Sequence, residues 1–339
     1  MYQFIGASLL HTGEMDLEAL TDLQTPWCIR IAVTLRIAER IEEGVDRADE
    51  LANAAGCDGP ALESLLRYLV GKGLFLEPEE GRFALNEAAR NLMSPAARIG
   101  LDLEGLGGRM SHAWGTLLQY TRTGKSAYQD IYGLPFWDDL EAHPAIAQEF
   151  DDLMGLVGHG VPNARFEIEG GWTNVRTIVD VGGGTGAMLA EILKLRPWLQ
   201  GTLVDMPRTV TPARKLFDPE GLQDRATARG QSFFDPLPPG ADVYLLRGVL
   251  NDWPDEDAIR ILRRCAEAAG PGGRVVILKS VKPEAKACGL VIEMVLAGGR
   301  LRSCEQFDVL AKGAGFTVTS ARQDASGYFV AECRTSATT

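Results

Sequence analysis

The sequence has no long apolar run, no paired cysteine motif and no excess of basic residues, and each absence excludes a class of protein. No apolar stretch reaches the length of about 18 residues that a membrane-spanning helix requires, so we expect no membrane partner. The first residues have neither the basic region nor the cleavage site of a secretory signal. We therefore expect a cytoplasmic protein.

The cysteines are scattered and do not indicate a metal site. They form no C-x-x-C pair, and no histidine stands at a spacing suited to zinc. We therefore predict that all six are reduced, buried thiols: Cys28, Cys57, Cys265, Cys288, Cys304 and Cys333.

The charge balance argues against a polyanionic partner. The 339 residues include 34 Lys and Arg against 46 Asp and Glu, which gives a formal net charge of −12 at pH 7. A phosphate backbone requires clustered cations, so we expect no nucleic acid partner. With 45% apolar and 24% charged residues, the composition is ordinary for a soluble globular protein of about two domains.

The most informative stretch is TIVDVGGGTG, at residues 177–186. Its β-branched start has the length and residue type of a buried parallel strand, and residues 187–195 follow with helical spacing. A strand, a glycine turn and a helix form the opening unit of a doubly wound sheet. In such sheets a ligand binds beyond the carboxyl end of the strand.

Two ligand classes and a purely structural turn all fit the glycines. Gly182, Gly184 and Ala187 satisfy the dinucleotide pattern G-x-G-x-x-G/A. Asp180, however, would project a carboxylate into the crevice, which suits an ammonium or a hydroxyl better than a pyrophosphate. The pattern D-x-G-x-G-x-G resembles the first motif of S-adenosylmethionine (SAM) dependent methyltransferases. Asp205 ends a second apolar strand about 20 residues on, where a carboxylate can bind two ribose hydroxyls.

The N-terminal part predicts helices and one hairpin. Residues 17–41 have apolar residues at helical spacing, interrupted by Pro26, and residues 46–55 and 59–72 predict two shorter helices. Residues 73–85 predict a small hairpin. This order suggests a winged helix and so raises DNA binding as a second function. The candidate recognition helix contains Arg67 and Lys72 but also Glu63, and the hairpin turn is acidic, which favours a domain for dimerisation and for covering the active site.

The rest of the chain alternates strands and helices after a helical segment. Residues 99–170 contain no strand pattern, and we expect some of their aromatic residues to face the crevice. Beyond residue 205 the pattern predicts strands at 226–228, 243–246, 274–278, 316–320 and 328–333, with helices at 255–269 and 305–314.

Several stretches together resemble the SAM-dependent O-methyltransferases of plant phenylpropanoid and bacterial aromatic-polyketide pathways, which include acetylserotonin-type enzymes. They are TPWCIRIAVTLRIAERI, YGLPFWDDL, VDVGGGTGA, LVDMP, SFFDPLPPGADVYLLRGVLNDWPDEDAIRILRRCAEAAGPGG and LAKGAGF, and they span nearly the whole chain. The resemblance implies an α/β, Rossmann-like methyltransferase domain with a mostly parallel seven-stranded sheet, preceded by an all-α winged-helix-like dimerisation domain. It also implies a homodimer, SAM as cofactor and a small aromatic substrate from secondary-metabolite or antibiotic biosynthesis.

The resemblance divides the chain and assigns the cofactor and acceptor residues. It implies a dimerisation domain at 1–98, a helical substrate-binding segment at 99–170 and a SAM-binding domain at 171–339. The implied cofactor residues are Asp180, Gly182 and Gly184 at the methionine end, Asp205 and Met206 at the ribose, Ser232, Phe233 and Trp253 at the adenine, and Arg247 as a basic contact. Ser232 stands where the family usually has an acid. Phe136, Trp137 and Met154 fall where relatives line the acceptor pocket.

The active site departs from the family pattern. Asn251 stands where relatives have the histidine that removes the acceptor proton, and Leu301 replaces a glutamate that braces it. Glu332 is expected to retain the second bracing acid. A carboxamide has no useful basicity near pH 7, so Asn251 can orient a substrate but cannot accept its proton.

Three other residues are candidate replacement bases: Asp252, Glu293 and His159. Asp252 also occurs in relatives that retain the histidine, so a loop-bracing role is the alternative for it. For His159 a surface or helix-end position is the favoured interpretation.

The altered site still permits methyl transfer. General base catalysis contributes about 10² to 10⁴ in rate, whereas alignment supplies effective molarities of roughly 10⁵ or more. We therefore predict methylation of an aromatic hydroxyl, carboxylate or activated carbon, mainly by proximity and orientation. The alternative is a non-methylating hydroxylation, decarboxylation or pericyclic step in which the bound sulfonium acts as a fixed positive charge.

Overall fold

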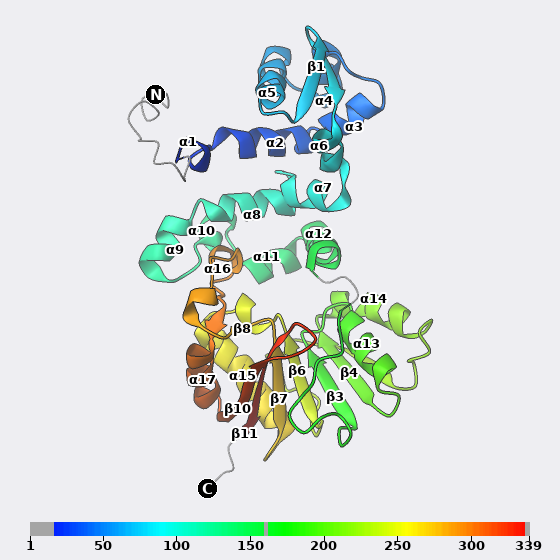
Figure 1. Ribbon diagram of the computed structural model, residues 1–339, viewed down its shortest axis with the longest axis vertical. Coiled ribbons are helices and arrows are strands. Elements are labelled where there is room, and N and C mark those ends of the chain that lie inside the picture. Colours follow the sequence, from blue (N-terminus) through cyan, green and yellow to red (C-terminus); the bar gives the residue numbers. More distant parts are fainter. Residues whose placement is uncertain (1–16, 159–161, 336–339) are drawn as a thin grey trace. The chain divides into compact units, whose positions relative to one another are not determined.

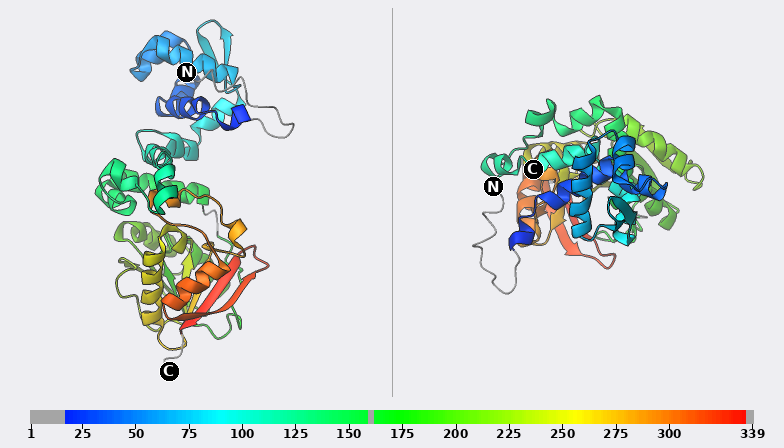
Figure 2. Two further views of the ribbon diagram at one scale, coloured as in Figure 1. Left: turned by 90° about the vertical axis from the view of Figure 1, so that its left-hand side faces the viewer. Right: turned by 90° about the horizontal axis from the view of Figure 1, so that it is seen from above.

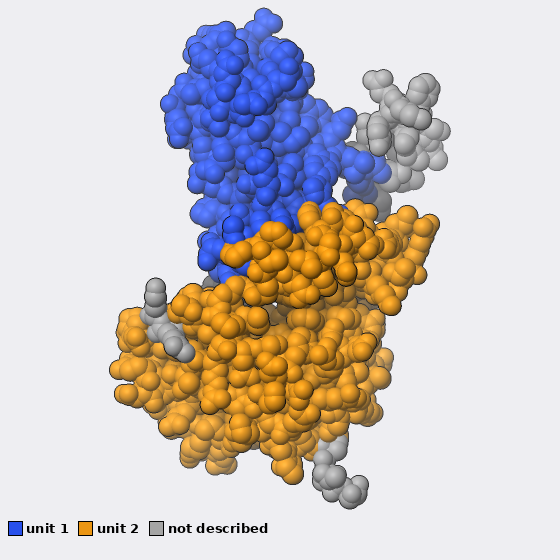
Figure 3. All heavy atoms as spheres, turned by 180° about the vertical axis from the view of Figure 1, so that it is seen from behind, with its two compact units in different colours: residues 1–112, 145–158 blue, residues 113–144, 159–339 orange. Residues whose placement is uncertain are grey.

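The chain forms two compact units in a computed structural model that describes residues 17–158 and 162–335. Unit 1 comprises residues 1–112 and 145–158, and unit 2 comprises residues 113–144 and 159–339 (Figure 3). This grouping differs from the three-part division predicted above. The helical segment 99–170 is not a body of its own: residues 99–112 and 145–158 group with the N-terminal helices, and residues 113–144 and 162–170 group with the sheet.

Unit 1 is helical apart from one hairpin. Its elements are α1 (Leu17–Leu20), α2 (Gln24–Thr34), α3 (Ile37–Glu42), α4 (Ala48–Ala55), α5 (Gly59–Gly71), β1 (Phe75–Glu79), β2 (Arg82–Leu85), α6 (Glu87–Arg90), η2 (Asn91–Met93), α7 (Pro95–Leu101), α8 (Leu106–Trp114), α12 (Pro144–Leu153) and the π-helix Met154–Gly158. The two short helices and the antiparallel hairpin predicted from the sequence are present as α4, α5 and β1–β2.

The helix predicted over residues 17–41 is divided into three. The Asp22 side chain accepts hydrogen bonds from the backbone N–H groups of Gln24 and Thr25, so α2 begins there and Pro26 lies in its first turn. A first-turn proline is tolerated because its missing N–H would have had no helical partner. The second break is at Arg36, which has a left-handed conformation with φ of 56°.

The cations on which the DNA-binding hypothesis depended are paired with carboxylates. Arg67 forms ion pairs with Glu63 at 2.9 Å and Glu77 at 3.1 Å, and Lys72 with Asp22 at 3.0 Å. A phosphate-binding surface requires cations that are available to phosphate. These ion pairs therefore argue against the DNA-binding hypothesis.

Unit 2 contains the sheet. Its elements are α9 (Leu117–Thr123), α10 (Tyr128–Tyr132), α11 (Phe136–Ala142), β3 (Thr177–Val181), α13 (Ala187–Leu195), β4 (Gln200–Asp205), α14 (Pro207–Phe217), β5 (Ala226–Gly230), β6 (Val243–Arg247), η4 (Leu250–Asp252), α15 (Asp255–Ala269), β7 (Arg274–Leu278), β8 (Val281–Lys282), η5 (Ala285–Ala287), α16 (Glu293–Leu296), β9 (Arg302–Ser303), α17 (Cys304–Gly313), β10 (Phe316–Gln323) and β11 (Phe329–Thr335).

The seven strands predicted for the sheet are all present, and their order fixes where a ligand can bind. The order is β10-β11-β7-β6-β3-β4-β5, with β11 antiparallel to both β7 and β10 and the other pairs parallel (Figure 1). The chain runs outward from β3 through β4 to β5 and then returns to place β6 on the other side of β3. A doubly wound sheet has its ligand crevice at such a switch point, beyond the carboxyl ends of the strands. The sheet therefore places a site beyond β3 and β6.

Helices cover both faces of the sheet (Figure 2). Alternating strand residues bury one set of side chains against α13 and α14 and the other set against α15 and α17. The central strands β3, β6 and β7 are buried on both faces, which explains why they are almost entirely apolar. Two layers of helices thus hold the carboxyl edge of the sheet rigidly.

The cysteine prediction was correct only in part. All six are free thiols, but only Cys265 and Cys333 are buried, because they face the core between the sheet, α15 and α17, and the other four are half-buried. Burial raises the pKa of the Cys265 thiol to about 12.

None of the helices formed by residues 17–158 and 162–335 is long and apolar enough to cross a membrane.

Candidate active site

The glycine turn after β3 is tied to the acid that ends β4. The backbone N–H of Gly184 donates to Asp205 Oδ2 at 2.8 Å, and Met206 N–H donates to Asp205 Oδ1 at 2.7 Å. Gly182 and Gly184 have φ of 69° and 63°, which strongly favours glycine. A Cβ at Gly184 would meet no atom within 4 Å, so this part of the turn faces open space. The turn thus leaves room for a ligand to approach the backbone.

Asp180 is a buried carboxylate without a protein partner. Its side chain is fully buried at the end of β3, and neither carboxylate oxygen has a hydrogen bond among the described residues. Burial raises the pKa of Asp180 to about 7, opposed by the positive charge of Arg247 and assisted by the negative charge of Asp205. An unpaired buried carboxylate beside open glycine backbone fits the ammonium group of SAM, which would supply the missing positive charge.

Aromatic rings stand beside the glycine turn on the adenine side. A Cβ at Gly182 would lie 2.7 Å from Val249 Cγ2 and 3.5 Å from Phe233 Cε1, so both residues pack directly on the turn. The Phe233 ring is 5.8 Å from the Trp253 ring, edge to face. The Ser232 hydroxyl accepts a hydrogen bond from the N–H of Phe234 at 3.2 Å, which shapes the turn after β5. These contacts bring the predicted adenine residues together.

The acceptor-side aromatic residues of α11 contact the same loop. Trp137 stacks on Trp253 with ring centroids 5.6 Å apart, and Phe136 packs edge to face on Trp137. Helix α11 is fixed by the hydroxyl of Tyr128, which donates to the buried Asp139 at 2.6 Å. Trp253 therefore connects the predicted adenine wall to the predicted acceptor wall.

Asn251 is held between two side chains. Its Nδ2 donates to Asp252 Oδ1 at 2.7 Å, and its Oδ1 accepts a hydrogen bond from the Ser280 hydroxyl at 2.8 Å. The carboxamide oxygen thus accepts one of the two hydrogen bonds that it can take, and Nδ2 donates one of its two hydrogens. Asn251 can still donate one hydrogen bond to a substrate oxygen.

Two acids lie next to Asn251. Burial raises the pKa of Asp252 well above its ordinary value, and the negative charge of Glu293 raises it further. Glu293 begins α16, which is anchored by the Ser126 hydroxyl, 2.6 Å from the carbonyl oxygen of Val295 and 2.9 Å from that of Leu296. A carboxylate with a raised pKa is a better proton acceptor than an ordinary aspartate.

The bracing role predicted for Glu332 is wrong. Glu332 is buried on β11, where its Oε1 accepts from the N–H of Glu169 at 2.7 Å and pairs with Arg322 at 3.1 Å. It lies opposite Val276 in the sheet, before the end of β7, and has no hydrogen bond to Asn251 among the described residues. Sequence spacing alone could not show that the Glu332 carboxylate binds the segment that precedes β3. Asn251 is braced instead by Ser280 and Asp252.

The remaining predicted residues have other positions. Arg247 ends β6 near Asp180, as its effect on the pKa of that carboxyl indicates. Met154 begins the π-helix of unit 1, and His159 lies outside the described residues.

Ser280 was missed by the sequence analysis. The available signal was a polar residue closely following a buried strand at the edge that also carries Asp180.

We predict that Asp180→Asn stabilises the protein without ligand at pH 8 but weakens SAM binding. The folded-state pKa of about 7 exceeds the ordinary value of 3.8, so the folded protein holds the proton longer and loses stability as pH rises between these values. A neutral carboxamide at this position avoids the loss. Differential scanning fluorimetry should show a Tm gain of several degrees at pH 8 and a smaller one at pH 5, with SAM affinity reduced at least about tenfold by calorimetry. Asp224→Asn, at an exposed position, is the control. An equal gain at both pH values would contradict the assignment.

We predict that Glu332→Gln affects stability and not turnover. The variant loses the charge that Arg322 and the Glu169 N–H share, which should lower the free energy of unfolding by about 1 kcal/mol. Chemical denaturation and steady-state kinetics measure the two effects separately. A specific fall in kcat with unchanged stability would restore Glu332 to the active site.

Two domain families match the chain. Residues 17–95 match the O-methyltransferase dimerisation domain, and residues 114–317 match the O-methyltransferase domain. The chain is 39% identical, over 94% of its length and 96% of the relative's, to 2,7-dihydroxy-5-methyl-1-naphthoate 7-O-methyltransferase of Streptomyces carzinostaticus. It is 37% identical, over 94% and 89%, to aclacinomycin 10-hydroxylase RdmB of Streptomyces purpurascens.

A solved structure of similar sequence supports the same family. The crystal structure of an O-methyltransferase from neocarzinostatin biosynthesis, in complex with SAM and 2-hydroxy-5-methyl naphthoic acid, superimposes with a TM-score of 0.81 at 37% identity. The match covers 96% of this chain and 100% of that one. The chain therefore belongs to the O-methyltransferase family, as a SAM-dependent methyltransferase that carries both the dimerisation domain and the catalytic domain.

Proposed function

We propose that this protein transfers a methyl group from SAM to a hydroxyl of a polycyclic aromatic natural-product intermediate. The observation that carries the proposal is the position of Asn251 in the loop after β6. Two residues before it in the sequence is Val249, which packs on the glycine turn, and two residues after it is Trp253, which stacks on Trp137. The relatives named for hydroxynaphthoate substrates support an acceptor of this class. When bound, SAM supplies an electrophilic methyl on its sulfonium.

Asn251 orients the acceptor. Ser280 and Asp252 hold the two ends of its carboxamide, and we assign the remaining N–H of Nδ2 to the substrate oxygen. An N–H donor stabilises an oxygen that already carries negative charge and contributes nothing to removing a proton. The site therefore favours acidic phenols, which are partly ionised before they bind.

Asp252 is the proposed proton acceptor for less acidic hydroxyls. Its carboxylate lies beside Asn251, and Glu293 and burial together raise its pKa. General bases contribute about 10² to 10⁴ in rate, less than alignment of the reactants supplies. The aromatic wall and Asn251 are therefore expected to matter for every acceptor, and Asp252 only for weak acids.

The direct test is incubation with methyl-labelled SAM and a set of hydroxynaphthoic acids. We expect a labelled methyl ether and one equivalent of S-adenosylhomocysteine for each product, both measured by mass spectrometry. The matched naphthoic acids without a hydroxyl are the control, since they should give no ether. Absence of labelled ether with every hydroxylated acceptor would contradict the proposal.

A non-methylating reaction is the second candidate, and the 37% identical aclacinomycin 10-hydroxylase is the observation that favours it. Asn251 cannot act as the family's base, while the cofactor frame around Asp180 and Gly184 is retained. In that reaction a fixed positive charge would stabilise negative charge that develops on the substrate. Consumption of substrate without release of S-adenosylhomocysteine would support it over methyl transfer.

We predict that Asp252→Asn is selective for weakly acidic acceptors. With such phenols kcat should rise with pH as Asp252 loses its proton, and the variant should be about 10² slower with no such rise. With strongly acidic phenols the loss should be within a few-fold. Asn251→Ala is the comparison, since it should slow both groups of acceptors by a similar factor. An equal loss in Asp252→Asn for all acceptors would assign Asp252 to bracing the loop.

A further inference from the structure

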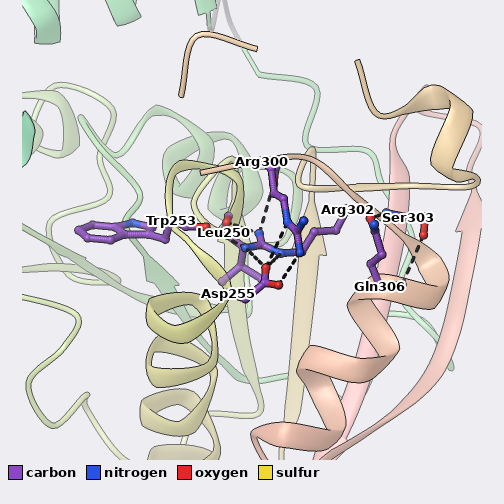
Figure 4. Close-up of polar contacts among 7 residues, drawn as sticks. All are labelled: Leu250, Trp253, Asp255, Arg300, Arg302, Ser303 and Gln306. Atoms are coloured by element: carbon purple, nitrogen blue, oxygen red, sulfur yellow. Dashed lines mark hydrogen bonds and ion pairs between the residues drawn. The ribbon is translucent and has the colours of Figure 1, made fainter. Parts of the chain in front are cut away.

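A buried arginine lies beneath the loop that carries Asn251 and Trp253. Arg302 begins β9 and has only 1% of its surface exposed. A guanidinium remains charged in proteins, so it can be buried only where fixed acceptors replace its hydration. Figure 4 shows these acceptors arranged around the Arg302 side chain.

Two of the acceptors belong to the loop itself, and the others are the carbonyl oxygen of Arg300, 3.2 Å from Nη1, and the carboxylate of Asp255. Arg302 Nη1 donates to the carbonyl oxygen of Leu250 at 2.6 Å, and Nη2 donates to that of Trp253 at 2.8 Å (Figure 4). Nε and Nη2 also donate to Asp255 Oδ1, at 3.0 Å and 2.9 Å. The two carbonyls flank Asn251 and Asp252, so one planar group fixes both ends of this short turn.

The backbone next to Arg302 packs directly on the same turn. A Cβ at Gly299 would lie 2.2 Å from the carbonyl oxygen of Asn251 and 2.4 Å from the carbonyl carbon of Asp252, so only glycine fits. The N–H of Arg302 donates to the carbonyl oxygen of Ser280 at 3.3 Å. Ser280 in turn holds the Asn251 side chain. Arg302 therefore contacts the turn and also the residue that orients its carboxamide.

We propose that Arg302 is a positioning residue, which sets the place of the Asn251 side chain relative to the cofactor turn. It acts through the carbonyls of Leu250 and Trp253 and through Ser280, and the kinetic part of its test rests on the proposed function. A small displacement of a group that aligns reactants has a large effect, up to about 10²-fold in rate for roughly 1 Å.

Arg300 provides a matched control. Its guanidinium also binds Asp255, but the side chain is 40% exposed, and in the described chain Asp255 is the only hydrogen-bonding partner of that guanidinium. Burial acts to raise the pKa of Asp255, but hydrogen bonds from both arginines outweigh it and hold that pKa below its ordinary value. The two arginines therefore share the carboxylate, and only Arg302 holds the loop carbonyls.

The experiment compares Arg302→Lys with Arg300→Lys in the full-length protein. Lysine keeps the charge near Asp255 but cannot donate to both carbonyls in the geometry of a guanidinium. We expect kcat to fall about tenfold to 10²-fold in Arg302→Lys, with SAM affinity by calorimetry within about threefold, because the glycine turn and Asp205 are untouched. Arg300→Lys should remain within about twofold in both. An unchanged kcat in Arg302→Lys, or an equal loss in both variants, would overturn the proposal.

Hydrogen exchange tests the same role without turnover, and so separates its failure from failure of the proposed function. In Arg302→Lys the amides of residues 250–253 should exchange faster, while those of β6 and β7 remain as in the wild type. Equal acceleration throughout the sheet would indicate a purely structural arginine. If Arg302→Lys does not fold, Ser280→Ala tests the same route, because it removes the hydroxyl that holds the Asn251 side chain and should give a similar fall in kcat with SAM binding retained. Full activity in that variant would overturn the proposal.

Discussion

The site depends on one buried carboxylate that the protein leaves without a partner. Asp180 stands at the end of the central strand, where both faces of the sheet are covered by helices and water cannot reach it. Burying an unpaired charge is costly, and its pKa of about 7 reflects that cost. A ligand that carries an ammonium group would remove this cost, so binding of such a ligand at Asp180 would couple cofactor affinity to stability.

Arg302 is the opposite case within the same unit. It is also a buried charge, yet its guanidinium donates to three backbone carbonyls and a carboxylate. A satisfied buried charge makes its surroundings rigid, whereas an unsatisfied one marks a place for a ligand. The two residues thus distinguish the fixed part of the site, which is the loop at Asn251, from the part that SAM completes.

The sheet was predictable because its strands are fully buried and therefore almost entirely apolar, and because glycine is required wherever the turn after β3 has positive φ. Side-chain partnership was less accessible. Glu332 was misassigned because its partner Arg322 lies on the neighbouring strand, a pairing that only the register of β10 and β11 reveals. The boundary between units within 99–170 was likewise hidden, because helical spacing does not show which body a helix packs against.

Under the proposed function, Asn251 changes which substrates suit the site more than whether it can act. Alignment is built into contacts that do not involve a base: the stacking of Trp137 on Trp253 and the hold of Ser280 on the carboxamide. An amide N–H aimed at the acceptor interacts more strongly with an anionic oxygen than with a neutral hydroxyl. Under the proposed function, such a site selects among aromatic acceptors of equal shape by acidity, so the substrate's own ionisation takes the place of a protein base.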